Sequence, residues 1–266
     1  MSIISGANVK FTHLVTVLKK IPTNSWRTIV EKEPEWYNMQ PFLEKYTFGQ
    51  FAVLMVACGL NDFQLKGTAD ISYWPKIKTL LESRAIVTVD DIGGVLHEFY
   101  SNERLGRMKN TRLNTFMKSS MARDMANSTP ESISKQFIEY WQRLAHTMNQ
   151  TSEKKTIVFA MKCLGLALLM AGECSFDFDP IPIPVDLRVR RLTAQLGFST
   201  STDEDVRLLW RQVLSALREE NQCVTMVHLD SFVWQIAGVE TSSISDYFKK
   251  VGCPEVGSEF TKLLSE

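Results

Sequence analysis

Apolar residues recur at spacings of three and four along almost the whole chain, and this period most constrains its fold. Such spacing indicates amphipathic helices, because 3.6 residues per turn bring these positions onto one face. The periodic runs cover residues 9–18, 42–60, 77–81, 133–144, 157–170, 206–217 and 232–236. Alternating patterns typical of strands are short, and the best of them, Ala85–Val89, fits a loop equally well. The sequence therefore predicts an all-α fold of about ten helices.

Local signals place two helix starts and one extended segment. Thr129-Pro130-Glu131 combines a capping residue, a first-turn proline and a first-turn acid. Ser201–Asp205 opens the helix before Val206 with acids that suit the positive end of the helix dipole. Asp177–Val185 contains three prolines within five residues and must be extended.

The length of 266 residues suits one compact unit, or two lobes that share a core. We expect a single two-lobed unit over residues 1–266, with a weak lobe boundary near residues 125–130. Thirty Lys+Arg balance thirty Asp+Glu, which excludes a polybasic coat protein or an acidic tail. A local patch can still bind nucleic acid, and Arg104–Arg123 carries basic residues with no acidic residue among them.

The sequence lacks the residue patterns that several functional classes require. Five widely spaced cysteines without a C-x-x-C pair disfavour a disulfide scaffold and a thiolate metal or iron–sulfur site. The four histidines lack ligand spacing, so no metal site and no cofactor is predicted. The most apolar stretch, residues 157–171, is too short to span a membrane, and the N-terminus shows no secretory signal. We expect a cytoplasmic protein.

Lys155 is the first candidate catalytic residue. It stands where a polar segment meets a strongly apolar helix, and Phe159 shares its helix face one turn later, with Lys162 near that face two turns on. A lysine at such an edge loses solvation, and a neutral amine is a nucleophile able to form a Schiff base. Taken alone, the motif also fits a snorkelling lysine beside a core helix.

Two carboxylates stand at further candidate positions. Asp186 follows the proline segment at the N-cap of a helix, where backbone N–H groups and the helix dipole favour the ionised form. Asp230 and Trp234 are four residues apart and pair a carboxylate with an indole, an arrangement able to read a guanine edge. Trp74 is a fourth candidate. Capping acids and core tryptophans remain the alternative interpretations.

Taken together and in this order, the motifs resemble the archaeal GO glycosylases (AGOG), a branch of the helix–hairpin–helix DNA glycosylases. The resemblance is carried by KTIVF (155–159), IPIPVDLRVRRLT (181–193) and HLDSFVW (228–234), and more weakly by LKGTADISYW (65–74) and KEPEW (32–36). It covers residues 30–240 and implies a two-lobed helical helix–hairpin–helix fold with its site between the lobes.

The resemblance implies a bifunctional enzyme that removes 8-oxoguanine from DNA and then cleaves the strand by β-elimination. Lys155 would be the Schiff-base nucleophile, and Asp186 the carboxylate that stabilises the developing positive charge. Phe159 and Trp234 would sandwich the flipped base. Asp230 would bind the Watson–Crick edge of the base, and Trp74 would line the pocket.

Two positions depart from the family pattern. Glu35 stands where the family can place a glutamine in the base pocket, and its carboxylate either accepts the N7–H of the oxidised base or points away. Residues 145–154 contain no glycine, whereas glycines form the phosphate-binding hairpin in most of the superfamily. The archaeal branch has an altered hairpin, so this second departure supports the branch.

Two alternatives stay open. One is a glycosylase for a different damaged base, with its pocket altered through Glu35. The other is a non-catalytic helical DNA-binding protein, although such a relic would be expected to lose Lys155 or Asp186, and both are present. The expected partner is DNA containing 8-oxoguanine. We expect a monomer that binds no membrane and is nucleoid-associated through its DNA.

Overall fold

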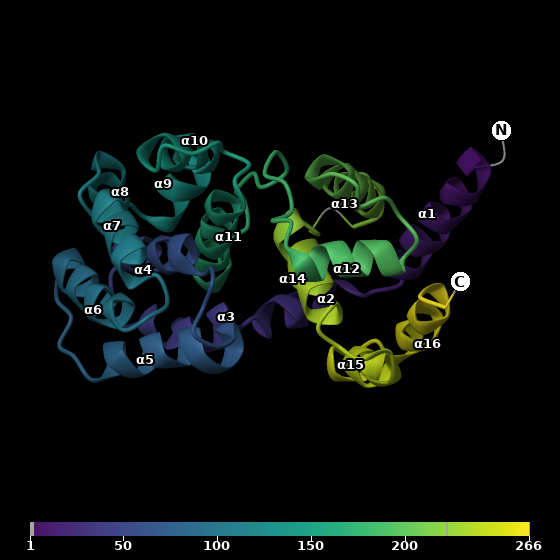
Figure 1. Ribbon diagram of the computed structural model, residues 1–266, viewed down its shortest axis with the longest axis horizontal. Coiled ribbons are helices and arrows are strands. Elements are labelled where there is room, and N and C mark those ends of the chain that lie inside the picture. The colour runs from purple at the N-terminus through teal and green to yellow at the C-terminus, as the bar shows by residue number, and fades with distance from the viewer. Residues whose placement is uncertain (1–2, 222, 266) are drawn as a thin grey trace. The chain divides into compact units, whose positions relative to one another are not determined.

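The computed structural model describes residues 3–221 and 223–265, with side chains from residue 9 onward. Throughout these residues the chain forms helices and loops, with no strand among them, so the expected all-α fold is confirmed (Figure 1). The helices outnumber the expected ten because several are short, such as α8 (Ser120–Ala126) and α9 (Pro130–Lys135). Helices of two turns or fewer are too short to produce a periodic pattern. In the described part of the chain, no helix is long and apolar enough to cross a membrane.

The chain divides into two compact units, and one of them is not contiguous in sequence. Unit 1 comprises Met1–Lys32 and Ile181–Glu266, and unit 2 comprises Glu33–Pro180. Residues 125–130, where the sequence suggested a weak boundary, lie inside unit 2. They form a turn between packed helices, in which the Ser128 hydroxyl lies 3.3 Å from the Tyr140 hydroxyl.

Unit 2 is built around the helix pair α4 (Phe48–Asn61) and α11 (Lys155–Met170), which pack along their length (Figure 1). Gly59 permits the close approach, because a Cβ atom there would lie 2.8 Å from the Cα atom of Ala160. The other helices of this unit surround the pair: α3 (Pro34–Met39), η1 (Gln40–Phe42), η2 (Ala69–Tyr73), α5 (Trp74–Glu82), α6 (Val89–Ser101), α7 (Gly106–Met117), α8, α9 and α10 (Phe137–Thr147).

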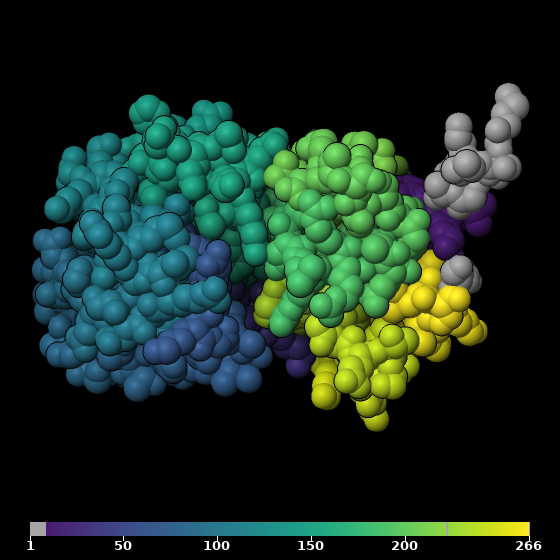
Figure 2. All heavy atoms as spheres, viewed as in Figure 1, coloured from purple at the N-terminus to yellow at the C-terminus, as the bar shows by residue number. Residues whose placement is uncertain are grey.

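Unit 1 joins the two ends of the chain around an aromatic core. Phe232 makes edge-on contacts with Trp26 and Phe260, with ring centroids 5.8 and 5.5 Å apart. Its helices are α1 (Ile3–Lys19), α2 (Thr23–Glu31), α12 (Leu187–Gln195), α13 (Asp203–Arg218), α14 (Met226–Ile236), η3 (Thr241–Ser243), α15 (Ile244–Lys250) and α16 (Pro254–Leu263). Figure 2 shows α12 and α13 in green and α15 and α16 in yellow on one face of this unit.

The predicted helix starts are confirmed. Thr129 caps α9 through a bond from the Ser132 N–H, with Pro130 at the first helical position. Thr202 forms a capping box with Asp205 at the start of α13. Residues 85–87 form a loop, and residues 181–185 run without regular secondary structure before α12.

The turn between α10 and α11 is closed without glycine. Asn149 adopts a positive φ of 50°, a conformation that asparagine tolerates better than most residues. The Gln150 N–H then bonds to the Ala145 carbonyl at 3.0 Å, and the Trp141 indole donates to the Ser152 carbonyl at 2.8 Å. This anchored turn leads directly into Lys155, so the absence of glycine does not prevent a compact hairpin.

We predict that acid destabilises unit 1 through His228. The Thr225 N–H and hydroxyl lie 3.3 and 3.0 Å from His228 Nδ1 at the start of α14, and burial lowers the pKa of His228 to about 4. The unfolded chain binds a proton near pH 6.5, so stability present above that pH is lost as the pH falls toward 4. The loss is up to about 1.4 kcal/mol per pH unit.

Thermal unfolding measured between pH 7.5 and 4.5 checks this. His228→Asn retains an acceptor near the Nδ1 position without a titrating ring, and it should flatten this part of the pH dependence. His97→Asn, at an exposed histidine of unit 2, is the matched control and should not. A pH dependence that is the same in His228→Asn as in the unsubstituted protein would contradict the assignment.

Candidate active site

Lys155 is the first residue of α11, and its side chain is exposed. The neighbouring Thr156 hydroxyl lies 3.2 Å from the Arg112 guanidinium, and it donates to the Gln150 side chain at 3.1 Å. Arg112 also donates to the Leu60 carbonyl at the end of α4, at 3.1 Å. The start of α11 is thereby tied to α7 and α4, which fixes the backbone that carries Lys155.

Lys162 is not a second surface lysine. Its side chain is 2% exposed and pairs with Glu33 at 3.2 Å, and Glu33 is equally buried. The Lys162 ammonium also lies 5.8 Å from the centroid of the Phe159 ring. Phe159 therefore has a buried cation beside its ring, which interacts favourably with the ring's electrons.

Glu35 is the second buried acid next to this ion pair. Its residue exposure is 2%, and its Oε2 atom has no hydrogen-bond partner. Burial, and then the negative charge of Glu33, raises the pKa of Glu35 well above its ordinary value, although Lys162 opposes the shift. Two buried acids share one buried lysine, which favours the neutral form of Glu35.

Trp74 is fully buried at the start of α5. Its indole N–H donates to Asp62 Oδ2 at 3.0 Å, and its ring packs edge-on against Tyr73 with centroids 5.3 Å apart. Asp62 ends α4, and burial raises its pKa to about 6, with the Trp74 bond and then Lys155 opposing the rise. Trp74 is therefore held at two points, and the sequence did not single out Asp62.

The basic segment 104–123 is partly internal. Lys109 is fully buried, with its ammonium 5.3 Å from the centroid of the Phe63 ring and 5.8 Å from that of Tyr73. Burial lowers the pKa of Lys109, and Arg112 performs the structural role described above. The expectation that this whole segment offers cations to phosphates is therefore corrected. Exposed side chains in it are Arg104, Arg107, Lys118 and Arg123.

Asp186 occupies the predicted N-cap of α12 in unit 1. Its Oδ1 accepts from the Val189 N–H at 2.9 Å, and its side chain is half-buried. The preceding residues 181–185 are buried, and the prolines among them restrict the backbone that presents the carboxylate. The cap therefore fixes the direction of the Asp186 carboxylate, because its Oδ1 atom is bound to the start of α12.

Asp230 and Trp234 both lie on α14, as predicted from their spacing. Asp230 is 3% exposed, whereas Trp234 is partly exposed. The Arg188 guanidinium, two residues after Asp186, lies 4.2 Å from the centroid of the Trp234 ring. Such a stack covers one ring face with a cation, and it links α12 to the helix that carries Asp230.

The predicted residues thus form one group in each unit. Unit 2 carries Lys155, Phe159, Glu35 and Trp74, and unit 1 carries Asp186, Asp230 and Trp234. The sequence missed the side chains that support them, which are Asp62, Lys162 with Glu33, and Arg188 in its stacking role. No local pattern marks these residues, because each partner is brought by a different helix.

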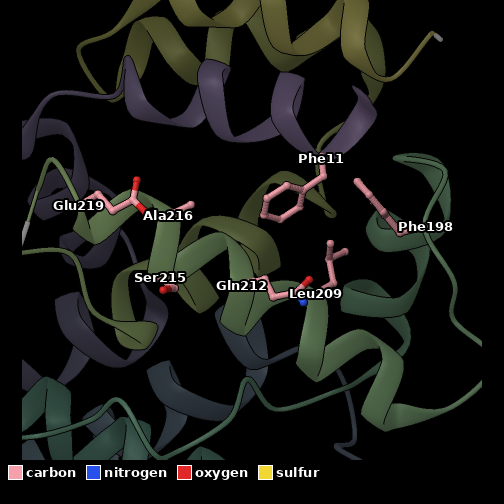
Figure 3. Close-up of a pocket in the computed structure, with 7 residues that line it drawn as sticks. All are labelled: Phe11, Phe198, Leu209, Gln212, Ser215, Ala216 and Glu219. Carbon is pink, nitrogen blue, oxygen red and sulfur yellow. The ribbon is translucent and has the colours of Figure 1, made fainter. Parts of the chain in front are cut away.

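A hollow in unit 1 between α1 and α13 lies apart from these residues. Phe11 and Phe198 face Leu209 and Gln212 across it, and Glu219 is its single ionisable side chain (Figure 3). Glu219 lies 3.6 Å from Lys19 in an exposed ion pair. The hollow therefore brings together no set of reactive groups, and it contains none of the predicted site residues.

The family model and the similar proteins carry the same description. The model of the AGOG family, described as N-glycosylase/DNA lyase, matches residues 15–263. An N-glycosylase/DNA lyase of Methanopyrus kandleri is 29% identical over 192 residues, covering 68% of this chain and 70% of that protein. An N-glycosylase/DNA lyase of Pyrobaculum aerophilum is 32% identical over 97 residues, covering 35% of this chain and 37% of that protein.

A solved structure shares the fold. The 8-oxoguanine DNA glycosylase Pa-AGOG from Pyrobaculum aerophilum, crystallised with 8-oxoguanosine, superposes with a TM-score of 0.74. The match covers 96% of each chain at 16% sequence identity. At this identity the structural match shows the fold alone.

Proposed function

We propose that this chain, which belongs to the AGOG family of N-glycosylase/DNA lyases, excises 8-oxoguanine from DNA and cleaves the strand through a Schiff base on Lys155. The observation that carries this proposal is the joint presence of Lys155 at the start of α11 and Asp186 at the cap of α12. The excised base is taken from the name of the similar Pa-AGOG protein.

The proposed chemistry needs an amine and an anion. The neutral amine of Lys155 attacks the sugar C1′, the C1′–N9 bond breaks, and its electron pair leaves with the base. The base takes up a proton, and the new ammonium at C1′ loses one. Positive charge develops on the sugar during this step, and the fixed Asp186 carboxylate stabilises it. Rearrangement to the imine then acidifies the neighbouring C2′–H, and loss of that proton expels the 3′ phosphate.

The remaining candidates serve base recognition in this proposal. Phe159 and Trp234 stack on the flipped base, and Asp230 accepts from its Watson–Crick edge. Arg188 covers one face of the Trp234 ring, and this proposal places the base on the other face. Trp74 supports the pocket from within unit 2. This activity requires no cofactor, and we expect a monomer acting on nucleoid DNA.

Incubation with a duplex carrying a single 8-oxoguanine tests the function. We expect base loss, strand scission and, with borohydride present, a covalent protein–DNA complex. Parallel duplexes with uracil or an alkylated purine separate the specificities. Excision of another base with 8-oxoguanine left intact would replace the proposed substrate, and no excision of any base would contradict the proposed enzyme.

We predict that Glu35 acts as a neutral acid, so that Glu35→Gln retains excision. A protonated carboxyl and a carboxamide both offer one donor and one acceptor, and the acceptor suits the N7–H of the oxidised base. Glu35→Ala removes both groups, and excision should fall about 10- to 100-fold, as expected when a buried hydrogen bond is lost.

Single-turnover excision at pH 7 measures both variants, with the exposed Glu44→Gln as control. A loss in Glu35→Gln as large as that in Glu35→Ala would show that an ionised carboxylate is required. Equal excision by all four proteins would remove Glu35 from base recognition.

A further inference from the structure

Asp62 has no part in the reaction proposed above, yet it lies among the residues that perform it. It ends α4, where the helix gives way to a short loop that leads through η2 to Trp74. The Phe63 N–H bonds to the Asn61 carbonyl at 2.9 Å, and Gln64 has a positive φ of 43°. This tight turn directs Asp62 back toward Trp74, whose indole N–H it accepts at 3.0 Å.

The hydrogen bond between Asp62 and the fully buried Trp74 joins the two ends of this loop. An indole N–H is a donor only, so a buried tryptophan needs an acceptor. A neutral oxygen would satisfy that need, and the Trp210 indole is satisfied in this way by the Thr193 hydroxyl at 3.0 Å. A carboxylate in this place adds a negative charge that the indole does not require.

Positive charges are gathered around Asp62. Arg112 donates both to the Leu60 carbonyl, two residues before Asp62, and to the Thr156 hydroxyl, next to Lys155, which brings the start of α11 to the end of α4. Lys155, Lys109 and Lys162 are accordingly within electrostatic reach of Asp62. The titratable groups that interact with Asp62 come from six helical elements: Glu35, Cys58, Tyr73, Tyr100, Lys109, Lys155, Lys162 and Cys163. Burial raises the pKa of the tyrosines and cysteines in this set above ordinary values that already exceed 7, so these groups are uncharged near pH 7, and burial also raises the pKa of Glu35.

We propose that Asp62 is a positioning residue for the lysine reaction: it anchors Trp74 and supplies a negative charge near Lys155. This inference rests on the proposed function of Lys155. The amine of Lys155 becomes positively charged when it forms an iminium with the sugar, and a nearby carboxylate stabilises that charge.

The charge on Asp62 depends on pH in the working range. Burial raises its pKa to about 6, so the carboxylate is ionised above that pH and becomes neutral as the pH falls through it. If Asp62 supports Lys155, formation of the covalent complex should weaken on the acid side of pH 6. Because the neutral fraction of any amine nucleophile falls with pH, the signature of Asp62 is a difference between the pH profiles of Asp62→Asn and the unsubstituted protein near pH 6.

Two substitutions separate the anchor from the charge. Asp62→Asn keeps an oxygen that can accept from the Trp74 indole, but carries no charge. Asp62→Ala removes both. The assay is the rate of borohydride trapping on DNA that already contains an abasic site, which isolates the amine reaction from base recognition. It is run from pH 5 to 8, with thermal unfolding measured alongside, and Asp70→Asn is the exposed control in the same unit.

We expect Asp62→Asn to fold normally and to trap about tenfold more slowly at pH 7.5. Its rate should approach that of the unsubstituted protein below pH 6, where Asp62 is neutral as well. Asp70→Asn should match the unsubstituted protein. An Asp62→Asn rate and pH profile identical to those of the unsubstituted protein would overturn the inference. If the unsubstituted protein itself fails to trap, the proposed function fails, and the two failures are thereby distinguished.

Discussion

Lys155→Gln should form no covalent complex with 8-oxoguanine DNA under borohydride, and strand scission should fall by about 10³-fold or more. Glutamine has no amine to attack the sugar C1′, so neither the imine nor the elimination that depends on it can form. The fold should be unaffected, because Lys155 is the exposed first residue of α11 and glutamine is about as good a helix former as lysine.

Lys154→Gln is the matched control for this variant. Lys154 is the adjacent exposed lysine, so its substitution removes the same charge and a comparable share of any phosphate attraction. Measuring DNA affinity and trapping for both variants separates binding from chemistry. Trapping that persists in Lys155→Gln would move the nucleophile to another lysine. Lys162 is the weaker alternative, because it is buried in its pair with Glu33, so Lys154 would be tested next.

Local chemistry made several features predictable. Asp186 was expected at an N-cap because an acid followed a proline run and preceded a helical pattern, and it caps α12. Lys155 with Phe159, and Asp230 with Trp234, were expected on shared helices because each pair is four residues apart, and both pairs are so placed. These inferences succeed because the interactions they use span a single helical turn.

Contacts between residues that are distant along the chain could not be predicted from the sequence. The indole acceptor Asp62, the Lys162–Glu33 pair and the Arg188 stack on Trp234 each depend on how separate helices pack. The basic run around Lys109 predicts a surface segment, whereas the structure buries the Lys109 side chain inside unit 2. The division into units was missed for the same reason, because unit 1 combines the two ends of the chain and no single boundary can reveal that.

The balanced net charge is partly explained by how the charges are used. Lys162 and Glu33 neutralise one another in the interior, and Arg190 pairs with Asp203 beside the start of α13. Cations that remain exposed on unit 2 include Arg104, Arg107 and Lys154. A DNA footprint built on a few such contacts gives a moderate salt dependence, because each phosphate contact contributes about −0.9 to the slope of log affinity against log salt.

Asp186→Asn should strongly slow turnover while leaving DNA binding and folding intact. Asparagine is as good an N-cap as aspartate, so the bond from the Val189 N–H, now 2.9 Å long to Oδ1, can be retained. The substitution removes only the negative charge. Because that charge is proposed to stabilise the positive sugar, kcat for base excision should fall about 10²- to 10³-fold, with little change in substrate affinity.

Asp205→Asn is the matched control, because it shows whether the loss of base excision is specific to Asp186 or follows from substituting another acid at a helix start. Asp205 is also an acid in the first turn of a unit 1 helix, where it completes the capping box of α13, and its substitution should alter stability without altering excision. Asp186→Ala adds the loss of the cap, which lowers unfolding free energy by about 1 kcal/mol. Excision by Asp186→Asn at the unsubstituted rate, in a protein that unfolds at an unchanged temperature, would remove Asp186 from the mechanism and leave it a helix cap alone.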